Sequence, residues 1–165
     1  MQEHIHTSLM PLSRYLQMTS WATAIRTSLW AYPFIQLIHF CGLSLWLGTN
    51  VAGDLRLLCV GKKPQTAADV RDELFAWNWI GFCITILGGF LLFSARATMY
   101  IINPAFRVKL LMLIPVAILF HIFVQAKTRG WGQSPETPGV AKLAGLIELL
   151  LWISVVTAAV EIPSY

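Results

Sequence analysis

The segment Trp30–Val51, WAYPFIQLIHFCGLSLWLGTNV, decides the fold class of this chain. It contains no charged residue, and it is long enough for a helix that crosses a hydrocarbon core of about 30 Å. Within a bilayer the backbone must satisfy its own hydrogen bonds, which an α-helix does. The segment therefore predicts a transmembrane helix, and with it a membrane protein.

The rest of the chain repeats this pattern of apolar blocks between polar connections. We expect an all-α integral membrane protein with a four-helix transmembrane domain over residues 29–165. The predicted spans are residues 30–53, 78–96, 105–126 and 142–162. In the short connection before the third span, Asn103 followed by Pro104 is typical of a helix N-cap with proline at the first helical position.

The composition supports a membrane protein and excludes several other classes. Of the 165 residues, 56% are hydrophobic and 12% are charged, about half the usual charged fraction. This argues against a disordered chain, a nucleic-acid-binding domain and a disulfide-stapled secreted module. The three cysteines form no CxxC pair, so neither a disulfide framework nor a zinc ribbon is indicated. No nucleophile–base set or phosphate-binding loop suggests a hydrolase, kinase or nuclease.

Residues 1–28 form a separate N-terminal segment, which we expect to be a tail and an amphipathic helix lying in the membrane interface. Its apolar residues recur at steps of three to five: Leu9, Leu12, Leu16, Trp21, Ile25 and Leu29. Arg14 and Arg26 interrupt the segment, which argues against a signal peptide. His4 and His6 could bind a metal, but a frayed terminus is the favoured interpretation.

The lysines and arginines predict the orientation in the membrane. One side of the predicted bundle carries seven: Arg56, Lys62, Lys63, Arg71, Lys127, Arg129 and Lys142. The opposite side carries five: Arg14, Arg26, Arg96, Arg107 and Lys109. This bias favours both termini on the periplasmic side.

Polar residues within the predicted spans are candidate site residues, because hydrophobic packing needs none. In the first span, one inward-facing seam is predicted from steps of three and four: Gln36, His39, Leu43, Trp46 and Asn50. In the third span, one line holds Arg107, Ile114, His121 and Gln125. In the fourth, Glu148 shares its face with Ala144, Gly145, Trp152, Val155 and Ala159. The second span offers the small residues Gly81, Thr85 and Gly89, which favour close helix packing.

Two inward-facing histidines suggest a b-type haem. His39 and His121 are the candidate iron ligands, and Arg96 and Arg107 could pair with the propionates. The alternative is that each histidine forms a hydrogen bond across the bundle and fixes the helix register. A shared iron is strained, because His121 lies about 9 Å and His39 about 22 Å from the same membrane side at 1.5 Å per residue.

Glu148 offers His121 a different partner. It lies about 9 Å deep at 1.5 Å per residue, which matches His121. A carboxylate and an imidazole at one depth predict a proton relay or a structural polar contact, and the sequence leaves both open. Gln36 and Asn50 are further candidates for such a polar role.

Two long stretches carry a resemblance: SLWAYPFIQLIHFCGLSLWLGTNVAGDLRLL at 28–58 and NPAFRVKLLMLIPVAILFH at 103–121. They resemble a group of small bacterial inner-membrane proteins of uncharacterised function, from about Leu9 onward. More distantly, the chain resembles the copper-resistance D and HemJ-type protoporphyrinogen oxidase families, with Lys109 and His121 at matching positions. That resemblance implies a haem-associated redox role with His39 and His121 as ligands. Where those families have Trp-Leu-His, this chain has Pro-Ala-Phe at 104–106, which argues against porphyrinogen chemistry.

Asp54 and Arg56 stand where the first span leaves the membrane. Capping or pairing with neighbouring loops is favoured there over quinone or partner recognition. The sequence as a whole predicts a small haem-b protein that passes electrons between the quinone pool and a periplasmic cytochrome or dehydrogenase. The alternative is a non-catalytic anchor or accessory subunit of a larger membrane complex, and a homo-oligomer stays open. If the protein is an enzyme, we expect an oxidoreductase.

Overall fold

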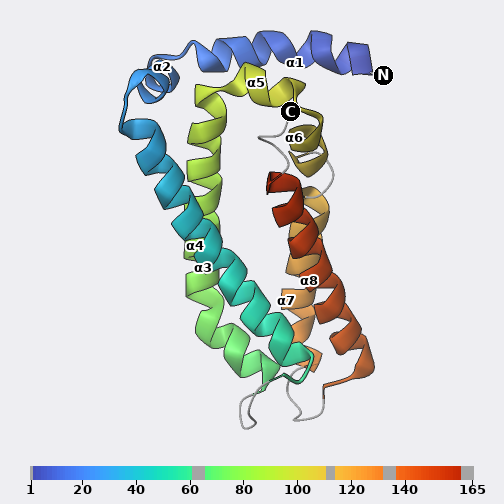
Figure 1. The fold of residues 1–165 in the computed structure, drawn as a ribbon. Coiled ribbons are helices and arrows are strands. Elements are labelled where there is room, and N and C mark those ends of the chain that lie inside the picture. Colours follow the sequence, from blue (N-terminus) through green and yellow to red (C-terminus); the bar gives the residue numbers. More distant parts are fainter. Residues whose placement is uncertain (1, 61–65, 111–113, 132–136, 161–165) are drawn as a thin grey trace.

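The computed structural model describes residues 2–60, 66–110, 114–131 and 137–160. These residues form helices and no strand. In chain order the helices are α1 (Gln2–Gln17), α2 (Ser20–Thr27), α3 (Ala31–Leu57), α4 (Ala67–Ala95), α5 (Ala97–Ile102), α6 (Pro104–Val108), α7 (Ile114–Trp131) and α8 (Gly139–Val160). In Figure 1, α3, α4, α7 and α8 run alongside one another, and α1 lies across one end of them.

Three helices are long and apolar enough to cross a membrane: α3, α4 and residues 139–159 of α8. These spans indicate a membrane protein. The apolar part of α7, Ile114–Thr128, is shorter. The all-helical prediction is confirmed for the described residues, whereas a fourth crossing remains a prediction.

Helix α4 begins at Ala67, well before the predicted start at residue 78. The reason is a capping box, in which the Asp69 amide donates to Thr66 Oγ1 at 3.1 Å and the Thr66 amide donates to Asp69 Oδ2 at 2.8 Å. Residues 67–77, which lie before the predicted second span, are therefore the first part of a helix. This places Arg71 and Asn78 on α4.

Small residues let α3 and α4 pack backbone against backbone. A Cβ atom on Gly81 would lie 2.7 Å from the amide nitrogen of Trp46, and one on Gly42 would lie 2.6 Å from the Ile84 Cγ2 atom. Close approach of this kind compensates for the weak hydrophobic drive between helices in lipid. The small-residue packing predicted for the second span is confirmed.

The core continues between α3, α7 and α8. Trp46 and Trp152 meet edge to face with ring centroids 4.7 Å apart, and Ala117 and Val155 pack in the same buried cluster. The predicted inner face of α8 is confirmed for the buried residues Ala144, Gly145, Glu148, Trp152 and Val155. Ala159 is half-buried.

The N-terminal segment is two helices, α1 and α2, rather than one. The helix is interrupted at Met18 and Thr19, where the Thr19 hydroxyl donates to the Leu16 carbonyl at 2.7 Å. The side chain of Gln17 holds α1 on α5, because its Oε1 accepts from the Thr98 amide at 3.0 Å and the Thr98 hydroxyl at 2.7 Å. The side chains of the candidate metal ligands His4 and His6 lie outside the described part.

The short helix α5 lies in the predicted connection before the third span, whereas the short helix α6 occupies the start of that predicted span, and α7 begins only at Ile114. The Asn103 side chain accepts a hydrogen bond from the Phe106 amide at 3.1 Å, and Pro104 is the first residue of α6. The Asn-Pro capping prediction is confirmed.

Candidate functional site: a buried ionic cluster

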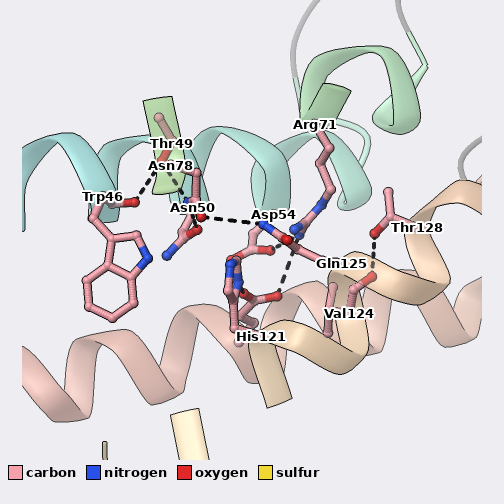
Figure 2. Close-up of polar contacts among 11 residues, drawn as sticks. Trp46, Thr49, Asn50, Asp54, Arg71, Asn78, His121, Val124, Gln125 and Thr128 are labelled. Atoms are coloured by element: carbon pink, nitrogen blue, oxygen red, sulfur yellow. Dashed lines mark hydrogen bonds and ion pairs between the residues drawn. The ribbon is translucent and has the colours of Figure 1, made fainter. Parts of the chain in front are cut away.

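Polar side chains from four helices converge inside the bundle (Figure 2). Asp54 comes from α3, Arg71 from α4, His121 from α7 and Glu148 from α8. We call these four residues the ionic cluster. They belong to the half of the bundle where α3 ends and α4 begins, opposite the end that α1 covers (Figure 1).

Arg71 and Glu148 connect the ionic cluster. Arg71 Nη2 lies 2.8 Å from Asp54 Oδ1 and 3.5 Å from Glu148 Oε2. The other carboxylate oxygen of Glu148, Oε1, shares a hydrogen bond with Nδ1 of His121. The four side chains are between 0% and 10% exposed, so the charges lie out of solvent.

The ionic cluster contains two acidic side chains and only one that is permanently positive. Asp54 and Glu148 supply two carboxylates, and Arg71 supplies one guanidinium that stays protonated in proteins. With a neutral His121 the net charge is −1, and with an imidazolium it is zero. Buried unbalanced charge is costly, so the neutral total requires one additional proton in the cluster.

Glycines make room for this arrangement. A Cβ atom on Gly53 would lie 3.3 Å from Cζ of Arg71, so a side chain there would press on the guanidinium. A Cβ atom on Gly145 would lie 3.2 Å from the backbone oxygen of Asp54. The close approach of α8 to α3 at Gly145 brings Glu148, one turn later, next to the arginine.

A second polar group, the amide cluster, adjoins the ionic cluster (Figure 2) and consists of Thr49, Asn50, Asn78 and Gln125. Asn78 Nδ2 donates to Asn50 Oδ1 and to Thr49 Oγ1, the latter at 2.9 Å. Gln125 Nε2 donates to Asn78 Oδ1 at 3.4 Å. Because Asn50 precedes Asp54 by one helical turn, the two clusters form one polar region along α3.

Several buried polar atoms in this region have no hydrogen-bond partner among the described residues. They are Asn50 Nδ2, Asp54 Oδ2, Arg71 Nε, His121 Nε2, Glu148 Oε2 and Trp152 Nε1. Glu148 Oε2 does make the 3.5 Å ion pair with Arg71, a long contact that leaves its hydrogen-bonding capacity unused. Native proteins leave few such atoms, so their concentration in one place sets this region apart from an ordinary core.

A cavity of about 480 Å³ lies between α4 and α7 and reaches the ionic cluster at Arg71. Ala68 and Phe75 of α4, and Gln125 and Ala126 of α7, are among its walls. One residue of each polar cluster thus lines the same cavity.

His121 and Glu148 are the predicted site residues that the structure brings together, and His39 lies elsewhere. The Nδ1–H of His39 donates to the Thr85 carbonyl at 2.9 Å, and its ring packs on Gly88 and Gly89 of α4. Fifteen residues separate His39 from Asp54 along α3, which is about 22 Å of helix. The two histidines therefore occupy different parts of the bundle, and haem ligation stays a prediction for each one separately.

The remaining candidates are scattered. Asn50 belongs to the amide cluster. Gln36 is half-buried near the start of α3, and Arg107 lies in the last turn of α6. Arg96 is exposed, with its guanidinium 4.9 Å above the ring of Tyr32. Among the described residues, no group of three His, Cys, Asp or Glu side chains is arranged to hold a metal ion.

Sequence reasoning missed Arg71 and Asn78 as site residues and left Asp54 as a capping residue. The overlooked signal is the Thr66-x-x-Asp69 box, which starts a helix at residue 67. On that helix Arg71, Asn78 and Thr85 follow at steps of seven and share one face.

Comparison with known proteins identifies the family of the chain but gives no more specific assignment. Searches of curated proteins and of solved structures returned no significant match, and no link to the copper-resistance D or HemJ-type families is shown. The model of a family of unknown function, DUF6644, matches residues 19–163, which include every residue of both polar clusters. The chain therefore belongs to DUF6644, a family of unknown function.

Proposed function

We propose that this protein binds and releases a proton within the membrane through the ionic cluster, as part of a redox process. The observation that carries the proposal is the charge count: two buried carboxylates face one guanidinium and one imidazole. The ionic cluster with a net charge of −1 becomes neutral when it takes up one proton.

The hydrogen bond between His121 Nδ1 and Glu148 Oε1 is the natural position for that proton. Glu148 is the carboxylate that contacts the His121 ring, while Asp54 lies 2.8 Å from Arg71. An imidazole and a carboxyl group can each hold or release the shared proton.

The polar atoms without a protein partner among the described residues support proton exchange over a purely structural network. A network that only stabilises a bundle satisfies its donors and acceptors, since each unmet one is costly. Here Asp54 Oδ2, Arg71 Nε and His121 Nε2 all keep free hydrogen-bonding capacity. Such atoms provide places for water or a ligand to deliver and remove a proton.

Infrared difference spectroscopy of the purified protein in nanodiscs tests the proposal. Between about pH 5 and pH 8, where ordinary exposed carboxyl groups are already ionised, we expect one carboxyl band and one imidazole band to change. Glu148→Gln and His121→Gln should remove these changes, whereas Glu73→Gln, at an exposed position on α4, should keep them. A wild-type spectrum that stays constant across this range would rule the proposal out.

A b-type haem is the second candidate, in a protein that passes electrons between the quinone pool and a periplasmic partner. The supporting observation is that Nδ1 of His121 is held by Glu148 while Nε2 is buried and unpartnered among the described residues. A carboxylate orients metal-ligating histidines in this way. Reduced and oxidised visible spectra of the protein expressed with added haem test it, with His39→Ala and His121→Ala to assign the ligand.

We also propose that α7 is a fourth span, in a bacterial inner membrane, with both termini in the periplasm. The excess of Lys and Arg near the ends of α3 and α7 supports this orientation. Alkaline phosphatase fused after residue 165 should then be active, because that enzyme works only outside the cytoplasm. If the infrared and visible spectra are both negative, an accessory subunit of a larger complex is the remaining proposal.

A further inference from the structure

We propose that the cavity between α4 and α7 binds the head group of a lipid-soluble quinone, an inference that rests on the proposed proton exchange at the ionic cluster. The cavity, at about 480 Å³, falls within the range of about 300–1,000 Å³ that is typical of small-molecule sites.

Arg71 connects the cavity to the ionic cluster. It lines the cavity, and the same side chain contacts Asp54 and Glu148. Gln125, which also lines the cavity, carries a side-chain amide with two N–H groups, and one of them is directed to Asn78 Oδ1. A quinone presents carbonyl oxygens that accept a hydrogen bond from the other N–H.

The other walls suit a flat apolar ring. Ala68 and Ala126 are small and leave space, while Phe75 and Ile122 provide apolar surface. Phe75 is 50% exposed and Ile122 is 48% exposed, so these walls continue onto the outer surface of the bundle. A ligand dissolved in the bilayer can therefore enter from the side and stack on Phe75.

The charges favour a neutral ligand over an anion. Arg71 already faces two carboxylates, Asp54 and Glu148. A phosphate or carboxylate ligand would bring a further negative charge next to them, which is costly at a buried site. A neutral carbonyl compound avoids that cost.

Equilibrium dialysis of a radiolabelled quinone with one isoprenoid unit, between protein-loaded and empty nanodiscs, tests the inference. The wild-type protein should bind the quinone saturably. Ala68→Phe and Ala126→Phe fill the cavity and should weaken binding at least tenfold. Ala76→Phe, at an exposed position on α4 outside the cavity lining, is the matched control and should bind as the wild type does. The same isoprenoid tail on an unsubstituted benzene ring should not compete.

Gln125→Leu adds no bulk and keeps the test valid if both cavity-filling variants misfold; it should weaken binding as well. The inference is overturned if the wild-type protein shows no saturable binding. It is also overturned if every variant that folds binds the quinone as tightly as the wild type does. Equal competition by the benzene analogue would show a merely apolar surface, and displacement by phosphatidylglycerol would show a lipid site. If binding fails while the Glu148-dependent infrared bands persist, the inference is wrong and the proposed function stands.

Discussion

Removing the charge of Arg71 should destabilise the protein strongly, and removing the charge of Asp54 as well should restore much of the loss. Arg71 Nη2 forms ion pairs with both buried carboxylates, at 2.8 Å from Asp54 and 3.5 Å from Glu148. Loss of one partner from a buried ion pair costs about 3–5 kcal/mol, because the remaining charge is left uncompensated. We expect Arg71→Gln to lower the free energy of unfolding by this amount.

The geometry also predicts which second substitution rescues the first. Without Arg71, Glu148 still has His121 as a hydrogen-bond partner, whereas Asp54 loses the cation with which it forms its ion pair. Asp54→Asn in the Arg71→Gln background should therefore recover stability, with a coupling free energy of about 2 kcal/mol or more. Glu148→Gln in the same background should recover less.

Reversible unfolding in mixed micelles with increasing dodecyl sulfate, followed by circular dichroism, measures these free energies. Arg14→Gln, at an exposed arginine on α1, is the control and should change stability by less than about 0.5 kcal/mol. The reasoning is refuted if Arg71→Gln costs no more than that control. It is also refuted if the two charge removals are simply additive, since an ion pair must couple them.

Three further predictions concern local structure and can be checked by thermal unfolding in detergent, and a fourth concerns the reactivity of Cys59. Gly81→Ala should destabilise by about 1–3 kcal/mol, because its Cβ would lie 2.7 Å from the Trp46 amide nitrogen and the helices must separate. Asn103→Ala should cost about 1 kcal/mol through loss of the α6 cap, and Asn103→Asp should cost much less. Cys59, after the end of α3, has a φ of 62°, a left-handed conformation that is strained for every residue with a Cβ atom. Cys59→Gly should therefore stabilise the protein by up to about 1 kcal/mol, and a loss of stability would contradict this explanation. A hydrogen bond from Thr137 lowers the pKa of the Cys59 thiol, so this cysteine should react with a water-soluble maleimide at lower pH than it does in a Thr137→Val variant.

The left-handed residue at Cys59 shows how much local detail the sequence conceals. The Val60 amide donates to the Leu55 carbonyl at 2.9 Å and the Cys59 amide to the Arg56 carbonyl at 3.0 Å, which is a Schellman ending. This ending normally has glycine at the left-handed position, and cysteine there gives no signal in the sequence. The Asn103–Pro104 cap, by contrast, uses the expected residues and was predictable.

The sequence by itself determined that this is a helical protein with helices long and apolar enough to cross a membrane, because apolar block length and the absence of charge are properties of the chain alone. It also determined the inner face of α8, since a helical repeat places Glu148 and Trp152 on one side. Only the tertiary structure decided which polar residues meet. Arg71 became a site residue because a capping box extends α4 and because Gly53 and Gly145 admit close neighbours. Distances between residues on different helices depend on how those helices pack, and helical periodicity carries no information about that packing.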